Sequence, residues 1–115
     1  RRQTDRGEEL ISIHGGATMV DSRYEITQEE EQKILHSVFF SIQPLRLKTF
    51  PPKEKKKVVI LRAIAQEFEQ GKTYTERQVN EILKEIFPDY VTLRRYLIEY
   101  GYLRRTRDGS AYWKN

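Results

Sequence analysis

The spacing of apolar residues along this chain predicts four amphipathic helices. In four stretches an apolar residue recurs every three or four positions, which gives a helix one buried face. Prolines and a glycine separate the stretches, at Pro44, Pro51–Pro52, Gly71 and Pro88. Proline cannot continue the helical hydrogen-bond ladder, and glycine favours a helix C-terminus. We therefore expect helices over about 27–43, 53–69, 75–86 and 90–100.

Local signals mark where three of these helices begin. Thr27 is followed by Glu30, and Thr75 by Gln78. In this capping-box pattern a hydroxyl and a carboxylate or amide satisfy the free N–H groups that open a helix. Asp89 is placed to cap the amides of the fourth helix in the same way. The starts of the first, third and fourth helices are thus predicted independently of the apolar spacing.

The end of the chain predicts a β-hairpin. Residues 102–106 are rich in strand formers, Asp108–Gly109 is a strong turn signal, and residues 110–114 supply a return strand. Thr73–Tyr74 is also expected to be extended. The expected fold class is mainly α with a small β-hairpin (α+β). The order helix, extended piece, helix, tight turn, helix, hairpin is that of a winged helix-turn-helix.

Three segments follow from this pattern. We expect residues 1–26 to be a flexible tail or linker, residues 27–44 to be an N-terminal helix packing on the core, with 45–52 a connector, and residues 45–115 to be the winged helix-turn-helix domain. Since the chain starts at Arg1 and not at Met, we treat it as a fragment, either an excised piece of a longer protein or a processed chain. No stretch reaches the about 20 apolar residues of a membrane span, and the start lacks the layout of a signal peptide. We expect a cytoplasmic protein with no membrane contact.

The residue types present argue against an enzyme. The chain has no cysteine and only two histidines, His14 and His36. Their scarcity removes disulfides, thiol catalysis and cysteine-based zinc sites, and argues against a histidine metal centre. Glu76 and Glu81 share a predicted helix without a nucleophile or metal set beside them. We expect no catalytic residue, no metal and no cofactor.

Charge is distributed unevenly along the chain. The net charge is +4, but residues 46–115 carry +7 and residues 1–45 carry −3. A basic domain favours a polyanionic partner, and double-stranded DNA is the one we expect. The alternative is that the lysines and arginines form an ordinary solvated face.

Four residues of the fourth helix are the candidates for contact with DNA: Thr92, Arg94, Arg95 and Tyr96. In a winged helix this helix enters the major groove. Arg95 points away from the apolar face and is placed for a bidentate contact with guanine, whereas Thr92 is placed for a base or a phosphate. Arg94 and Tyr96 lie at the flanks, where Arg94 suits a phosphate. The alternative is that these arginines pair with carboxylates of their own or the neighbouring helix.

Two further basic groups are candidates for binding anions. Arg104, Arg105 and Arg107 lie in or beside the hairpin, where they are expected to follow the sugar-phosphate backbone, although at least one of them is open to simple solvation. Lys53, Lys55, Lys56 and Lys57 crowd the start of the second helix, against the positive end of its dipole. An anion bound there would compensate them, and so would Glu54 or solvent screening.

Several polar and aromatic residues are expected to be structural instead. Asn80 is a weak helix former on the first helix of the predicted motif, a position that favours a structural hydrogen bond. Tyr74, Tyr90, Tyr100 and Trp113 fall where a small domain needs bulky anchors between helices and hairpin. We therefore expect core packing from these rings and no platform for stacking bases.

Residues 45–113 also resemble a known family. The similarity is carried by Leu47–Lys48, Pro51–Pro52–Lys53, Lys56–Lys57, Tyr74–Thr75–Glu76, Val79 to Leu83, Asp89–Tyr90, Leu93–Arg94–Arg95, Leu97–Ile98, Tyr100–Gly101, Leu103, Arg105, Gly109 and Tyr112. This pattern is similar to that of an uncharacterised bacterial domain found alone or behind the DNA-binding region of ArsR-type transcriptional regulators. The resemblance implies a role in transcription regulation and carries no catalytic residues and no ligand.

Three functions remain open at this point. The leading one is a DNA-binding winged-helix domain of a bacterial transcriptional regulator. The second is protein contact, as a homodimer or with a partner domain of a regulator, without direct DNA contact. The third is an anionic-effector-sensing module that uses the lysines of residues 53–57.

Overall fold

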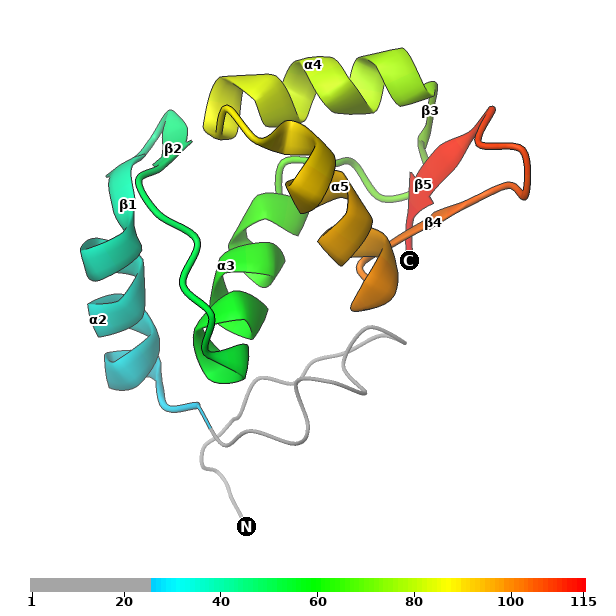
Figure 1. The fold of residues 1–115 in the computed structure, drawn as a ribbon. Coiled ribbons are helices and arrows are strands. Elements are labelled where there is room, and N and C mark those ends of the chain that lie inside the picture. The colour runs from blue at the N-terminus through cyan, green and yellow to red at the C-terminus, as the bar shows by residue number, and fades with distance from the viewer. Residues whose placement is uncertain (1–25) are drawn as a thin grey trace, which may run out of the picture.

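The computed structural model describes residues 26–115, which form four helices and two small antiparallel sheets (Figure 1). The helices are α2 (Gln28–Val38), α3 (Glu54–Ala65), α4 (Glu76–Ile86) and α5 (Tyr90–Glu99). The strands are β1 (Phe39–Ile42), β2 (Leu45–Leu47), β3 (Thr73–Tyr74), β4 (Leu103–Arg105) and β5 (Tyr112–Lys114). The expected α+β class is confirmed. The predicted tail lies outside the described residues except for Ile26, which is buried.

The predicted caps open the three helices for which they were expected. The Thr27 hydroxyl oxygen accepts a hydrogen bond from the Glu30 amide at 3.0 Å. Thr75 and Gln78 form the full reciprocal box, with bonds of 3.1 and 2.8 Å. The Asp89 carboxylate accepts from the backbone amide three residues on, at 3.3 Å. These helices therefore start where their own side chains satisfy the first unpaired amides.

The first helix ends earlier than its apolar spacing predicts. We expected it to reach residues 41–43, which was wrong, and we expected residues 45–52 to be a connector, which holds only for residues 48–52 because residues 45–47 form a strand. α2 ends at Val38, and β1 turns at Gln43–Pro44 to pair antiparallel with β2. Phe39 lies opposite Leu47, and both side chains are buried. Pairing with a partner strand thus overrides a spacing that fits a helix equally well.

The second predicted helix also ends early. α3 stops at Ala65, where we expected helix to Glu69. In residues 66–68 each amide donates to the carbonyl three positions earlier, at 3.0–3.2 Å, which is the tighter 3₁₀ pattern. The tighter turns still bring Phe68 into the core. Gly71, at φ +84°, then redirects the chain into β3, a conformation that glycine adopts without steric cost.

The predicted hairpin and the predicted extended piece form one sheet. β5 lies in the middle, between β3 and β4, and both neighbours are antiparallel to it. Thr73 lies opposite Trp113, and Arg104 lies opposite Trp113 from the other side. The hairpin turn contains Gly109 at φ +76°, as its Asp-Gly signal predicts. The sheet therefore ties the loop before α4 to the end of the chain.

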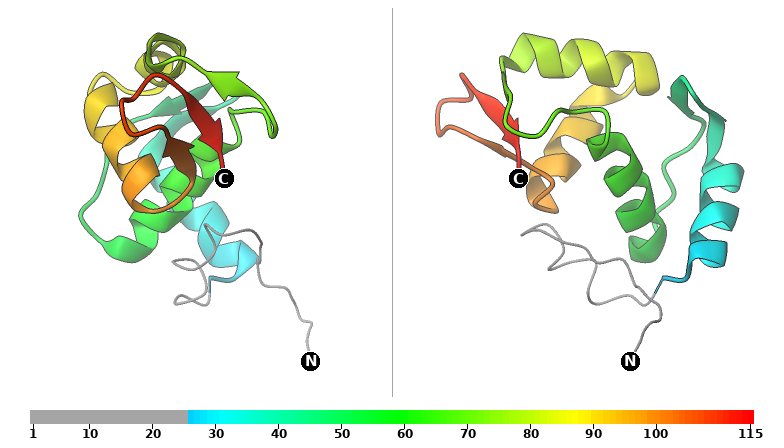
Figure 2. Two further views of the ribbon diagram at one scale, coloured as in Figure 1. Left: turned by 90° about the vertical axis from the view of Figure 1, so that its right-hand side faces the viewer. Right: turned by 180° about the vertical axis from the view of Figure 1, so that it is seen from behind.

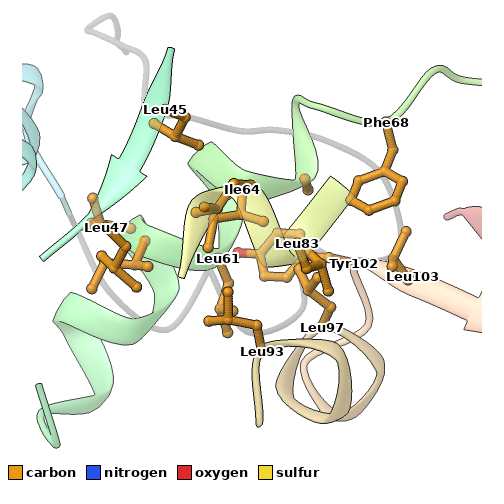
Figure 3. Close-up of a cluster of buried hydrophobic side chains, with 14 of the residues drawn as sticks. Leu45, Leu47, Leu61, Ile64, Phe68, Leu83, Leu93, Leu97, Tyr102 and Leu103 are labelled. Carbon is orange, nitrogen blue, oxygen red and sulfur yellow. The ribbon is translucent and has the colours of Figure 1, made fainter. Parts of the chain in front are cut away.

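A single core joins all these elements. α3 supplies its centre, and side chains of α4, α5 and β4 pack around it, as Figure 3 shows for Leu61, Ile64, Leu83, Leu93 and Leu97. The β1–β2 hairpin adds further apolar side chains to the same cluster. The boundary expected between residues 44 and 45 therefore falls inside a hairpin.

The aromatic anchors differ in depth. Tyr74 is buried against Phe68, with the ring centroids 5.2 Å apart. Tyr90 and Tyr100 are half-buried and pack against the core, in agreement with the structural role expected for them. Trp113 is half-buried in β5, the middle strand of its sheet.

The elements are arranged with the two hairpins apart. Figures 1 and 2 show α2 and the β4–β5 hairpin at opposite sides of the molecule, with α3 and α5 between them. None of the helices within residues 26–115 has the length and apolarity to cross a bilayer.

Candidate nucleic-acid interface

Three residues join α4 to α5. Phe87 ends α4, its amide donating to the Leu83 carbonyl at 3.0 Å. Pro88 prevents continuation of the helix, and Asp89 caps the next one. Leu83, Leu93 and the rest of the inner faces are fully buried, so the direction of each outer side chain on α5 is fixed by the packing of its inner face.

Arg95 lies on the exposed face of α5, the direction that its position in the helix predicts. Its side chain is 58% exposed, and its Nε is 3.8 Å from the Glu99 carboxylate. Its guanidinium also lies 5.4 Å from the centroid of the Tyr96 ring. An exposed ion pair of this kind contributes at most about 1 kcal/mol. Arg95 is therefore accessible to an anionic or hydrogen-bonding ligand.

Arg94, the neighbouring residue, is held between α5 and α4. Its Nη1 donates a hydrogen bond to the Asn80 side-chain oxygen and lies 3.5 Å from the Glu76 carboxylate, and only 20% of the side chain is exposed. The sequence left two alternatives open for Arg94, contact with a phosphate or pairing with a carboxylate. The observed geometry corresponds to the second, with the carboxylate supplied by the neighbouring helix. Asn80 makes the structural hydrogen bond expected of it. Together the three side chains bind α5 to α4.

Thr92 and Tyr96 are also engaged within the domain. The Thr92 hydroxyl donates to the Asp89 carboxylate at 2.7 Å. The Tyr96 ring stacks on Phe50 at 5.2 Å, and the Lys57 ammonium group lies 4.7 Å from its centroid. Tyr96 is half-buried by these contacts. It therefore packs α5 against the loop before α3 and is not presented on the outer face.

Val91 is an outward residue that the sequence analysis missed. It is 47% exposed and precedes Arg95 by four positions, so the two side chains lie on one face of the helix. The signal was present in the sequence, because Val91 falls outside the apolar stripe of Leu93 and Leu97. An apolar side chain beside an arginine suits a DNA groove, where it can contact a thymine methyl group.

Glu76 connects the helices to the hairpin, a role that sequence reasoning also missed. Its carboxylate faces Arg94, and the Tyr112 hydroxyl donates to it at 3.4 Å. Burial raises the pKa of the Tyr112 hydroxyl above its usual value, and the negative charge of Glu76 raises it further. No local pattern signals this contact, since 36 positions separate the two residues.

The hairpin turn is closed by its own side chains. The Asp108 carboxylate accepts hydrogen bonds from the Ser110 amide at 3.0 Å and the Thr106 hydroxyl at 2.8 Å. These bonds lower the pKa of Asp108 to about 2, the backbone bond from Ser110 being the largest cause. Arg105 folds over the same turn and donates to the carbonyls of Thr106 and Arg107, at 2.9 and 3.0 Å.

All three hairpin arginines, Arg104, Arg105 and Arg107, are exposed. Arg105 also makes the hydrogen bonds within the turn. The structure thus gives one of the three candidates a local role in the β4–β5 hairpin.

The four lysines at the start of α3 are not brought to one point. Lys55 forms an ion pair with Glu30 of α2 at 2.6 Å. Lys57 lies against Tyr96 of α5 and 4.0 Å from Glu54. Lys53 precedes the helix without a side-chain cap bond, and Lys56 is half-buried. Carboxylates compensate part of this charge, which is the alternative that the sequence left open.

No metal site is evident in the part of the chain that the structure describes. Within residues 26–115, no three His, Asp or Glu side chains gather in a way that would hold an ion. His14 lies outside the described residues.

Comparison with known families identifies one match. Residues 46–114 match the model of a family described as "Uncharacterized protein conserved in bacteria (DUF2087)". No curated protein and no solved structure matches the chain. The matched span agrees with the resemblance found over residues 45–113, and the expected bacterial domain of unknown function is confirmed. The span runs from β2 to β5 and excludes α2 and β1.

Proposed function

This chain belongs to that family of uncharacterised proteins conserved in bacteria, and we propose that it binds double-stranded DNA through α5 as a winged helix-turn-helix domain. The order α3–β3–α4–α5–β4–β5, with α4 and α5 joined by a tight turn, supports the assignment of this fold. In such a motif the second helix of the pair enters the major groove and the hairpin lies along the backbone.

The observation that carries the proposal is the outward direction of Arg95. Its guanidinium group stands on the exposed face of α5, where it makes an exposed ion pair with Glu99. Giving up that contact for two hydrogen bonds to guanine costs little, because an exposed ion pair contributes at most about 1 kcal/mol. Val91 extends the same face toward the start of the helix.

Two of the exposed hairpin arginines fit the phosphate contacts of the proposal. Arg104 and Arg107 are displayed by a turn that Asp108 and Arg105 hold in one conformation. A preformed turn loses less conformational entropy on binding. Charges of this kind give affinity that depends on salt, without dependence on base sequence.

Arg94 receives a different role in this proposal. It acts as a positioning residue that sets the orientation of α5 on α4 through Asn80 and Glu76. Thr92 and Tyr96, which are engaged within the domain, support the same helix. The residues proposed to touch DNA are therefore Arg95, Val91, Arg104 and Arg107.

The cellular role extends the same proposal. We assign the domain to a bacterial transcriptional regulator acting in the cytoplasm, in agreement with its resemblance to domains that accompany ArsR-type DNA-binding regions. The basic charge of residues 46–115 supports a polyanionic partner. Effector sensing at residues 53–57 is less favoured, because Lys55 and Lys57 are already paired within the domain.

The test is fluorescence anisotropy of a labelled mixed-sequence duplex at about 50 and 200 mM salt. Arg95→Glu is compared with Lys33→Glu, a charge reversal at an exposed position of α2, a helix that takes no part in the proposed contact. We expect binding that weakens with salt, a loss of at least about tenfold for Arg95→Glu, and little change for Lys33→Glu. Absence of binding at both salt concentrations, or equal losses in the two variants, would overturn the proposal.

A further inference from the structure

The exposed face of α5 is a narrow stripe of three side chains. Val91, Arg95 and Glu99 are exposed, whereas the other residues of the helix are buried or half-buried. The three are spaced by four positions, so they follow one another along one side of the helix. The proposed DNA contact uses Val91 and Arg95 and assigns no role to Glu99. A carboxylate on this face opposes the charge of the DNA phosphates and lowers affinity for any sequence.

The Glu99 carboxylate approaches Arg95 at one particular nitrogen. Its oxygen lies 3.8 Å from Nε, the nitrogen that joins the guanidinium group to the rest of the side chain. A guanidinium group has two edges that can donate a pair of parallel hydrogen bonds: one contains Nε, and the other consists of Nη1 and Nη2. An ion pair at Nε leaves the Nη1–Nη2 edge for a second acceptor. Through that edge Arg95 can bind the O6 and N7 atoms of guanine without giving up Glu99.

The Tyr96 ring restrains the same guanidinium group from a second direction. The group lies 5.4 Å from the ring centroid, within the range of a cation–π contact. The ring is itself held, since it stacks on Phe50 with the centroids 5.2 Å apart. The side chain of Arg95 is 58% exposed, whereas that of Arg77, which forms an ion pair of the same length with Glu81 on α4, is 89% exposed. The difference indicates that Arg95 lies along the helix surface and that Arg77 extends into solvent.

We propose that Glu99 is a positioning residue for base recognition, which holds Nε of Arg95 so that the Nη1–Nη2 edge is presented to guanine. The inference rests on the proposed function, because it assigns a base preference to the same surface of α5. A guanidinium group that is already oriented loses less conformational entropy when it binds. Glu99 therefore lowers the affinity of the domain for DNA in general and raises its preference for guanine.

The test measures preference for guanine separately from affinity. Fluorescence anisotropy at about 50 mM salt compares the labelled mixed-sequence duplex with the same duplex in which 7-deazaguanine replaces every guanine. The replacement removes the N7 acceptor from the major groove and keeps the phosphate charge and the base pairing. The ratio of the two dissociation constants therefore reports contacts with guanine. We expect a ratio of at least about 3 for the wild-type chain and about 1 for Arg95→Ala.

The Glu99→Ala variant separates positioning from charge. Loss of a negative charge is expected to tighten binding to both duplexes and to lower the guanine ratio by about twofold or more. Glu99→Gln keeps an oxygen that can accept from Nε, and it is expected to retain part of the preference. The matched control is Glu81→Ala, which removes the same charge from the corresponding ion pair on α4. We expect it to leave the ratio unchanged.

A measurement without DNA tests the restraint itself. The nitrogen–proton heteronuclear NOE of the Nε–H group reports picosecond-to-nanosecond motion of each arginine side chain. We expect a higher value for Arg95 than for Arg77, and a fall to the Arg77 value in Glu99→Ala. Equal values for the two arginines in the wild-type chain would overturn the inference and leave the DNA-binding proposal standing.

The DNA measurements can overturn the inference in other ways. A wild-type ratio of about 1 would mean that Arg95 does not read guanine, and a ratio that Glu99→Ala leaves intact would mean that Glu99 does not position it. A ratio that falls equally in Glu81→Ala would be a general effect of charge. In these three cases DNA binding itself stands. Absence of binding to both duplexes would overturn the proposed function, and this inference with it.

Discussion

At the scale of single residues, adjacent arginines on α5 have different environments. One step along a helix rotates the side chain by about 100°. That rotation directs Arg94 into the angle between α4 and α5 and Arg95 to solvent. The apolar stripe of Leu93 and Leu97 predicts the outward direction of Arg95. The two groups that bind Arg94, on Asn80 and Glu76, are 14 and 18 positions away, and local sequence cannot identify them.

The first prediction separates the two arginines by stability. Arg94→Ala leaves the side chains of Asn80 and Glu76 without this bond in a half-buried place. We expect the free energy of unfolding to fall by about 1–3 kcal/mol. Arg95→Ala is expected to stay within about 0.5 kcal/mol of wild type, as exposed substitutions usually do. Urea denaturation followed by circular dichroism measures both, and equal losses would contradict the assignment of Arg94 to positioning.

The second prediction concerns pH and the hairpin turn. The folded pKa of Asp108, about 2, lies below its ordinary value of 3.8. A depressed carboxyl pKa stabilises the folded turn above pH 3.8, and this contribution is lost as the pH falls through 2. In NMR titrations the Ser110 amide shift should therefore show a midpoint near pH 2, with no such step in Asp108→Asn. A midpoint near 4 would mean that the turn does not hold the carboxylate.

At the scale of elements, helix starts follow from short-range chemistry. The capping box of Thr75 and Gln78 satisfies two amides within one turn of α4, and the sequence alone identifies it. Helix ends do not follow from short-range chemistry in the same way. Residues 39–42 fit the helical spacing, but they form a strand because they pair with β2 and because Phe39 is buried. Such pairing has no local signal, because the turn at Gln43–Pro44 lacks the glycine of common hairpins.

The third prediction tests the contribution of that capping box. Thr75→Ala removes the oxygen that accepts from the Gln78 amide, and we expect a loss of about 1 kcal/mol in the free energy of unfolding. Thr75→Ser keeps the oxygen and is expected to restore most of it. Thermal and urea unfolding of the three proteins measure the difference. If Ser is as destabilising as Ala, the methyl group of Thr75 matters more than its hydrogen bond.

At the scale of the whole molecule, the segment outside the family match completes the core. Ile26 and side chains of α2 and β1 lie in the same cluster as those of α3. Ion pairs support this contact from the surface, with Arg62 2.8 Å from Glu31 and Lys55 2.6 Å from Glu30. Residues 26–115 should therefore unfold as one cooperative unit.

The last prediction follows from that single core. A protein of residues 46–115 retains the matched span but loses β1, the strand that pairs with β2, and uncovers the apolar surface beneath Ile34 and Val38. Each of these buried side chains contributes about 1.5–3 kcal/mol, so the free energy of unfolding should fall by at least about 3 kcal/mol relative to residues 26–115. Urea unfolding and binding of an apolar dye measure the change. If the short protein is equally stable, α2 and β1 are an appendage, and they can be removed without disturbing the proposed DNA-binding surface.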